Sequence, residues 1–78
     1  MFYTYILFSQ KDKKLYTGYT KNLKLRFEEH KNGSVESTKY RRPLELIYYE
    51  ACKKQDDAIR REKVLKSYRG KMFLRRRL

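Results

Sequence analysis

Hydrophobic and polar positions in the first part of the chain follow the pattern of a β-hairpin. The segment MFYTYILFS (residues 1–9) is rich in aromatic and β-branched residues, and LYTGYT (15–20) repeats this character, so each predicts a strand. The polar segment QKDKK (10–14) between them predicts the turn. Antiparallel pairing of these strands is expected to bring Tyr5 and Tyr16 close together.

After this hairpin, the spacing of the apolar residues changes to that of a helix. Asn22 is a favourable N-cap residue, and the apolar residues Leu23 and Phe27 recur at helical spacing after it. The Asn-Gly pair at 32–33 supplies a stop signal. The pattern therefore predicts a helix from Asn22 to about Lys31, with a narrow apolar stripe.

The second half of the chain repeats the sequence of loop, strand and helix. GSVESTKYRRP (33–43) is polar, contains Gly and Pro and has no periodicity, which predicts a mobile loop. LELIYYEAC (44–52) predicts a third strand. Asp56 and Asp57 are expected to cap a second helix over 58–67, where their charges also suit the helix dipole.

This element order predicts an α+β fold: a small three-stranded antiparallel sheet flanked by helices, in the order β-β-α-β-α. We expect the helices to cover one apolar face of the sheet and to enclose a single core. The 78 residues suffice for one domain, so the prediction is a single domain over 1–78 with a basic C-terminal segment at about 69–78.

Charge indicates a polyanionic partner. The chain has 21 Lys and Arg residues against 9 Asp and Glu residues, a formal net charge of +12, and nucleic acid is the first candidate. The segment RGKMFLRRRL (69–78) suits contact with phosphate or with an anionic membrane surface, and a solvated tail is the simpler interpretation.

Other classes of protein are disfavoured. The single cysteine, Cys52, cannot form an intramolecular disulfide, which fits a reducing compartment. The apolar runs are too short to span a bilayer, and no signal-peptide pattern opens the chain. We therefore expect a cytoplasmic protein that does not insert into a membrane.

Glu62 is the residue that packing explains least. On a helical projection it falls within the apolar arc that Ala58, Ile59 and Leu65 form. A carboxylate on that face is costly unless it is paired or bound to a metal, and Mg²⁺ binds to one or two carboxylates plus waters and substrate phosphate. Glu62 is therefore either a metal ligand or the partner of a nearby Arg or Lys.

Arg26 and His30 lie four residues apart on the first helix, on one face beside the apolar stripe. Arginine there can contact a phosphate through two hydrogen bonds, and histidine can move a proton or interact with the end of the helix dipole. Gly18 leaves room for a ligand near Tyr5 and Tyr16, and nearby cations would be needed to make a tyrosine a useful base.

These features resemble the GIY-YIG nuclease family, and the resemblance covers nearly the whole chain. The family has two strands ending in its name-giving tripeptides, then a helix with an arginine and a later helix with a glutamate. Here YTY (3–5), YTG (16–18), Arg26 and Glu62 are similar in order and spacing. The segments LYTGYT, RRPLELIYYE and REKVLK are most similar to small stand-alone members of the family. The departures are Tyr3, where the family name has glycine, and Thr17, where it has isoleucine.

The resemblance implies an endonuclease that hydrolyses phosphodiester bonds in DNA with one Mg²⁺ or Mn²⁺ ion, with repair or recombination as its setting. Glu62 would hold the ion, Tyr16 or Tyr5 would accept or relay the proton of the attacking water, and Arg26 would stabilise charge on phosphorus. His30 matches a position where some relatives use histidine, to assist deprotonation or to hold Tyr16.

Two other functions stay open: a non-catalytic nucleic-acid-binding module of the same fold, and a ribosomal or membrane-surface protein. DNA is the expected partner and RNA the alternative, with a protein partner supplying specificity and a monomer or weak dimer as the oligomeric state. The residues expected to contact nucleic acid are Lys21, Lys24, Arg41, Arg42, Arg61 and Lys66.

Overall fold

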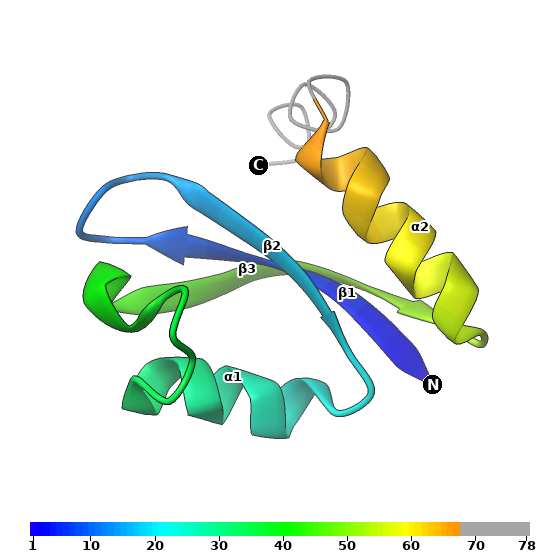
Figure 1. The fold of residues 1–78 in the computed structure, drawn as a ribbon, viewed down its shortest axis with the longest axis horizontal. Coiled ribbons are helices and arrows are strands. Elements are labelled where there is room, and N and C mark those ends of the chain that lie inside the picture. The colour runs from blue at the N-terminus through cyan, green and yellow to red at the C-terminus, as the bar shows by residue number, and fades with distance from the viewer. Residues whose placement is uncertain (68–78) are drawn as a thin grey trace.

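A three-stranded antiparallel sheet forms the centre of the protein in a computed structural model that describes residues 1–67 (Figure 1). Strand β1 is the middle strand and pairs with β2 on one side and β3 on the other. The elements are β1 (Phe2–Ser9), β2 (Leu15–Thr20), α1 (Leu23–Asn32), the 3₁₀ helix η1 (Lys39–Arg41), β3 (Leu44–Cys52) and α2 (Gln55–Lys66). The predicted α+β fold and its β-β-α-β-α order are confirmed, and the basic segment expected at about 69–78 lies outside the described residues.

The two helices lie on opposite faces of the sheet (Figure 1). Side chains alternate along β1, so Tyr5 and Leu7 point towards α1, whereas Ile6 points towards α2 and contacts Leu65. Our expectation of one apolar face with a single core was therefore wrong. The four consecutive large residues of β1, Tyr5 to Phe8, are what a strand covered on both faces requires.

Helix α1 begins and ends as its sequence predicts. The Asn22 side chain accepts a hydrogen bond from the Leu25 N–H at 3.1 Å, which satisfies one of the free donors of the first turn. Gly33 ends the helix with φ of 79°, a left-handed conformation that glycine adopts without strain. These two caps fix the position of the helix along the sheet.

Helix α2 differs from the prediction at its start. It begins at Gln55, its N-cap is Lys54, and no side chain caps it, so the expected capping by Asp56 and Asp57 was wrong. Both acids lie instead within the first turn, where the helix dipole favours negative charge. The Thr4 hydroxyl donates a 2.7 Å hydrogen bond to the Ala58 carbonyl and ties α2 to β1.

The segment between α1 and β3 is more ordered in its packing than a mobile loop. It contains η1, and Val35 and Thr38 are both buried. Burial of these side chains gives the segment contacts that its irregular sequence did not predict. Within residues 1–67, neither helix has the length and apolar character needed to cross a bilayer.

Candidate active site

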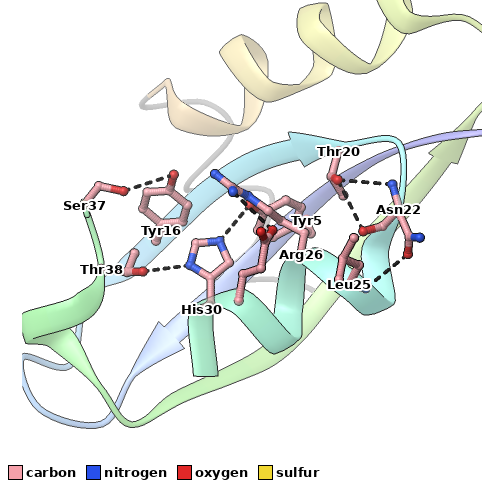
Figure 2. Close-up of polar contacts among 10 residues, drawn as sticks. Tyr5, Tyr16, Thr20, Asn22, Leu25, Arg26, His30, Ser37 and Thr38 are labelled. Carbon is pink, nitrogen blue, oxygen red and sulfur yellow. Dashed lines mark hydrogen bonds and ion pairs between the residues drawn. The ribbon is translucent and has the colours of Figure 1, made fainter. Parts of the chain in front are cut away.

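Tyr5 lies at the centre of a polar cluster between the hairpin and α1 (Figure 2). Its side chain is 2% exposed, and its strand partner across the hairpin is Gly18. A Cβ atom on Gly18 would lie 2.6 Å from the Tyr5 hydroxyl oxygen, so only glycine leaves room for this position of the tyrosine ring. The glycine of YTG therefore shapes the site directly.

The Tyr5 hydroxyl is joined to a buried histidine. Nε2 of His30 is 2.9 Å from the Tyr5 oxygen, and Nδ1 of the same ring is 2.7 Å from the Thr38 hydroxyl (Figure 2). His30 and Thr38 are both fully buried. The chain Tyr5–His30–Thr38 thus connects the central strand, α1 and the segment before β3.

Burial and the Arg26 guanidinium lower the pKa of His30 to about 4, so the imidazole is neutral at pH 7. A neutral imidazole donates through one nitrogen and accepts through the other. Either the Tyr5 hydroxyl donates to Nε2 and Nδ1 donates to Thr38, or both bonds run in the opposite direction. The ring therefore couples the proton position on Tyr5 to that on Thr38.

Arg26 lies one turn before His30 on α1 and points to the same cluster (Figure 2). Its guanidinium hydrogen-bonds to the Tyr5 hydroxyl and pairs with Glu29 at 3.4 Å. The side chain is still 37% exposed, so it can reach a ligand from a fixed position. Its charge lowers the pKa of Tyr5, but burial outweighs it and raises that pKa to about 12.

Tyr16 lies beside Tyr5 but is only half-buried. Its ring centroid is 6.5 Å from that of Tyr5 and 5.3 Å from that of His30, and Ser37 donates a long hydrogen bond of 3.4 Å to its hydroxyl. Tyr16 also lines a cleft along the outer edge of β2, together with Leu65 and Lys66 of α2. Of the two tyrosines, Tyr16 is the one that a molecule in this cleft can reach.

Glu62 lies on α2, with a side chain that is 18% exposed and an oxygen 3.8 Å from Lys66 Nζ. Its charge acts on Tyr5 across the edge of the sheet and is one cause of the raised Tyr5 pKa. The carboxylate therefore has a lysine partner, and this lysine lines the cleft that Tyr16 also lines. Binding of a metal ion by Glu62 stays a prediction.

Comparisons with known proteins agree with this arrangement. The family model described as "GIY-YIG catalytic domain" matches residues 1–75. This chain belongs to the GIY-YIG family. The "UPF0213 protein in ldhD 5'region" of Pediococcus acidilactici is 42% identical over 95% of this chain and 78% of its own length, and a UPF0213 protein of Staphylococcus aureus strain Mu3 is 40% identical over 82% and 79%. No solved structure matches the chain.

Membership of the GIY-YIG family indicates a nuclease-type function, with nucleic acid as the substrate. Four of the residues expected in the site gather around one hydrogen-bonded cluster, whereas the fifth, Glu62, lies on α2 and contacts Lys66. Sequence reasoning missed Ser37 and Thr38, which contact Tyr16 and His30. Their segment has no periodicity, and no local signal indicates that it folds back onto α1.

Glu62 is the carboxylate expected to bind a metal ion, and its side chain is 18% exposed. Within residues 1–67 no three His, Cys, Asp or Glu side chains gather in a way that would hold a metal ion. A site of this composition does not suit Zn²⁺, which takes three or four protein ligands. It fits Mg²⁺, which keeps waters and substrate oxygens around one or two carboxylates.

The basic residues expected to contact nucleic acid lie in different surroundings. Arg41 pairs with Asp12 at 2.6 Å, and this contact lowers the pKa of Asp12 to about 2. Arg61 forms two hydrogen bonds to Glu50, of 3.0 and 2.9 Å. Both arginines therefore hold elements of the fold together, and their contact with nucleic acid stays a prediction.

The other four basic residues expected to contact nucleic acid border a cleft, a groove or a hollow of the surface. Lys66 is 55% exposed beside the cleft, and Lys21 and Lys24 line a groove at the start of α1. Arg42 donates to the Lys39 carbonyl and lines a hollow at the other end of α1. The sequence analysis did not single out the three lysines that share this hollow with Arg42, namely Lys11, Lys31 and Lys39.

Proposed function

We propose that this protein is a divalent-metal-dependent endonuclease that hydrolyses phosphodiester bonds in DNA. The observation that carries the proposal is the contrast between two adjacent tyrosines in one polar cluster. Tyr5 lies against Gly18 and hydrogen-bonds to His30 and Arg26, whereas Tyr16 lines an open cleft together with Lys66, the ion-pair partner of Glu62. A scissile phosphate in this cleft would meet the Tyr16 hydroxyl and the Lys66 ammonium group, and we place Arg26 and Glu62 at its two sides.

Tyr16 is the group we assign to the attacking water. Its hydroxyl can orient the water, and its phenolate form can accept the proton of the water, because the residue is half-buried and the cleft is open at this point. Tyr5 stays protonated at pH 7, because its pKa is raised to about 12, so it does not supply a phenolate as base. Its role in the proposal is to hold Arg26 through a hydrogen bond.

Arg26 would stabilise the negative charge that builds up on the non-bridging oxygens of the phosphate. Its exposed fraction of 37% leaves part of the guanidinium accessible, and its contacts with Tyr5 and Glu29 fix the orientation before substrate binds. A donor held in place before the reaction stabilises the transition state without a cost of reorganisation.

Glu62 would hold one Mg²⁺ or Mn²⁺ ion. When bound, such an ion polarises the phosphate and stabilises the leaving oxygen. The carboxylate is mostly buried and its lysine partner is 3.8 Å away, a distance at which the attraction is weak for an exposed lysine. Lys66 can therefore turn to the phosphate backbone when the carboxylate takes a cation.

The experiment is to incubate the protein with supercoiled, single-stranded and branched DNA and with RNA, in the presence of Mg²⁺, Mn²⁺ or a chelator. Glu62→Ala, purified by the same scheme, controls for a contaminating nuclease. We expect metal-dependent cleavage by the wild type and none by Glu62→Ala, with the two proteins equally folded.

Equal cleavage by both proteins would contradict the proposal. Binding without cleavage under any metal would favour the second candidate, a nucleic-acid-binding module of the same fold. The pairing of Glu62 with Lys66 is the observation that suits this candidate, because a carboxylate used only to hold a lysine needs no metal.

A further inference from the structure

A groove next to the polar cluster has no part in the chemistry described so far. It has a volume of about 520 Å³ and opens between the start of α1 and the sheet, on the face that carries Tyr5. Its aromatic walls are Tyr3, Phe27 and Tyr49, and its charged residues are Lys21, Lys24 and Glu28.

The groove lies beside the polar cluster of Tyr5. Tyr49 is the partner of Tyr5 in the register between β1 and β3, so the two side chains are neighbours on one face. Tyr3 precedes Tyr5 by two residues on the same strand and the same face, roughly 7 Å away along β1. Anything held in the groove therefore lies next to the cluster.

Packing explains Phe27, which lies against the core, but it does not explain Tyr49. Tyr49 is 56% exposed although it lies in the middle of β3, and its ring contacts that of Tyr3 in an edge arrangement, with centroids 6.2 Å apart and planes at 64°. A tyrosine so exposed adds little to the stability of a core. It does present a flat aromatic surface at the mouth of the groove.

The charges around the groove favour an anionic ligand. Unlike Arg41 and Arg61, Lys21 and Lys24 make no ion pair within residues 1–67. Lys21 and Lys24 carry two positive charges against the one negative charge of Glu28, so the net charge around the groove is positive. Aromatic surfaces combined with free cations are the means by which proteins hold single-stranded nucleic acid, because each base stacks on a ring while its phosphates meet lysine.

We propose that this groove holds an unpaired base of the strand that is cut, next to the scissile phosphate. The inference rests on the proposed function and makes it more specific. Bases in a duplex are stacked on their neighbours and cannot enter such a groove unless they leave the stack. The preferred substrate is therefore single-stranded DNA, or DNA with an unpaired segment at the point of cleavage.

The test measures binding in the presence of a chelator, so that no cleavage occurs. A fluorescent oligothymidylate and an abasic oligomer of the same length carry the same number of phosphates, so they differ only in the bases. We expect the wild type to bind the oligothymidylate roughly 5- to 100-fold more tightly than the abasic oligomer, the range typical of stacking of one or two bases.

Two tyrosine variants identify the groove as the source of this preference. Tyr49→Ala is expected to reduce the preference at least about fivefold, and Tyr49→Phe, which keeps the ring, to retain it. Tyr40→Ala is the matched control, because Tyr40 is 74% exposed and lines the hollow with Arg42, which shares no residue with the groove. Circular dichroism checks that each variant is folded.

Several outcomes would overturn the inference. These are equal affinity of the wild type for both oligomers, equal losses in Tyr49→Ala and Tyr40→Ala, and a concentration-dependent dimer that Tyr49→Ala abolishes, which would assign the groove to a second copy of the chain. Cleavage assays separate this inference from the proposed function. Metal-dependent cleavage without a base preference contradicts only the groove, whereas a base preference that depends on Tyr49 without any cleavage contradicts only the endonuclease.

Discussion

The two faces of the sheet belong to the same three strands but bury different kinds of side chain. The face under α2 is mainly an apolar contact in which Ile6, Ala58 and Leu65 are at most 1% exposed, with one hydrogen bond from Thr4 to the Ala58 carbonyl. The face under α1 buries His30 and Thr38 as fully, yet these residues are polar and bond to one another and to Tyr5.

This difference indicates which face carries the chemistry. Within residues 1–67 no buried side-chain nitrogen or oxygen lacks a hydrogen-bond partner, so the polar face does not leave groups unsatisfied. A fully bonded polar network limits the rotamers of its members and holds them in place. Changes in the apolar contacts under α2 are therefore expected to alter stability, and changes in the polar network under α1 to alter the reaction. Glu62 is the exception, because it lies on α2 but is proposed to hold the metal ion.

Tyr16→Phe, which removes one hydroxyl from the cleft, is expected to have a large effect on the cleavage rate. Single-turnover cleavage should fall at least about 100-fold, the usual contribution of a positioned acid or base. The unfolding midpoint should barely change, because Tyr16 is half-buried and its hydroxyl has only a long contact with Ser37. Tyr19→Phe, on the same strand but the opposite face, is the control and should cleave normally. Equal rates for the two variants would contradict the role of Tyr16.

Leu65→Ala should act mainly on the stability of the fold. Removing a leucine that is 1% exposed costs about 2–5 kcal/mol of unfolding free energy, a large share of the stability of a small domain. The measurement is urea unfolding, with Val64→Ala as the control, since Val64 is the next residue of α2 and is 43% exposed. A loss for Val64→Ala as large as that for Leu65→Ala would mean that α2 packs differently.

Stability should also depend on pH through the polar face. The pKa of His30 in the fold is about 4, below its ordinary value of 6.5, so the unfolded chain takes up this proton first as the pH falls. The contribution of neutral His30 to the free energy of unfolding is fully present above pH 6.5 and is lost as the pH falls to about 4. The loss amounts to at most about 3 kcal/mol.

Unfolding curves recorded across this pH range measure the effect. His30→Gln should lower stability at pH 7 and flatten the dependence between pH 6.5 and pH 4. A wild type with constant stability over that range would contradict the burial of a neutral imidazole.

The smallest effect is expected from Thr38→Val, which keeps the shape of the side chain and removes its hydroxyl. The loss of one buried hydrogen bond should lower the cleavage rate about five- to tenfold. Nitrogen NMR of the His30 ring should report a changed balance of tautomers, and Thr38→Ser should restore both the rate and the spectrum. An unchanged spectrum in Thr38→Val would show that Thr38 does not set the proton position on His30.

The same comparison explains how much could be predicted from the sequence. The three strands, α1 and the contact between Tyr5 and Tyr16 follow from local patterns and hairpin pairing, which act over short stretches of chain. The opposite placement of the helices was missed, although the continuous run of large residues in β1 carried a signal for it.

Other features depend on contacts between segments far apart in sequence. Thr38 bonds to His30 because the segment before β3 folds back onto α1, and Arg61 pairs with Glu50 because α2 packs beside β3. Neither contact has a periodic pattern. The unequal burial of Tyr5 and Tyr16 likewise depends on the fold, because Tyr5 lies in the middle strand of the sheet and Tyr16 in an edge strand.

The most direct test of the account is the single-turnover cleavage rate of Arg26→Lys, measured together with its unfolding midpoint. The substitution keeps the positive charge but removes the planar group that contacts Tyr5 and Glu29. We predict a rate at least about 100-fold lower, with the midpoint nearly unchanged. A folded Arg26→Lys protein that cleaves at the wild-type rate would contradict the assignment of the polar face as the active site.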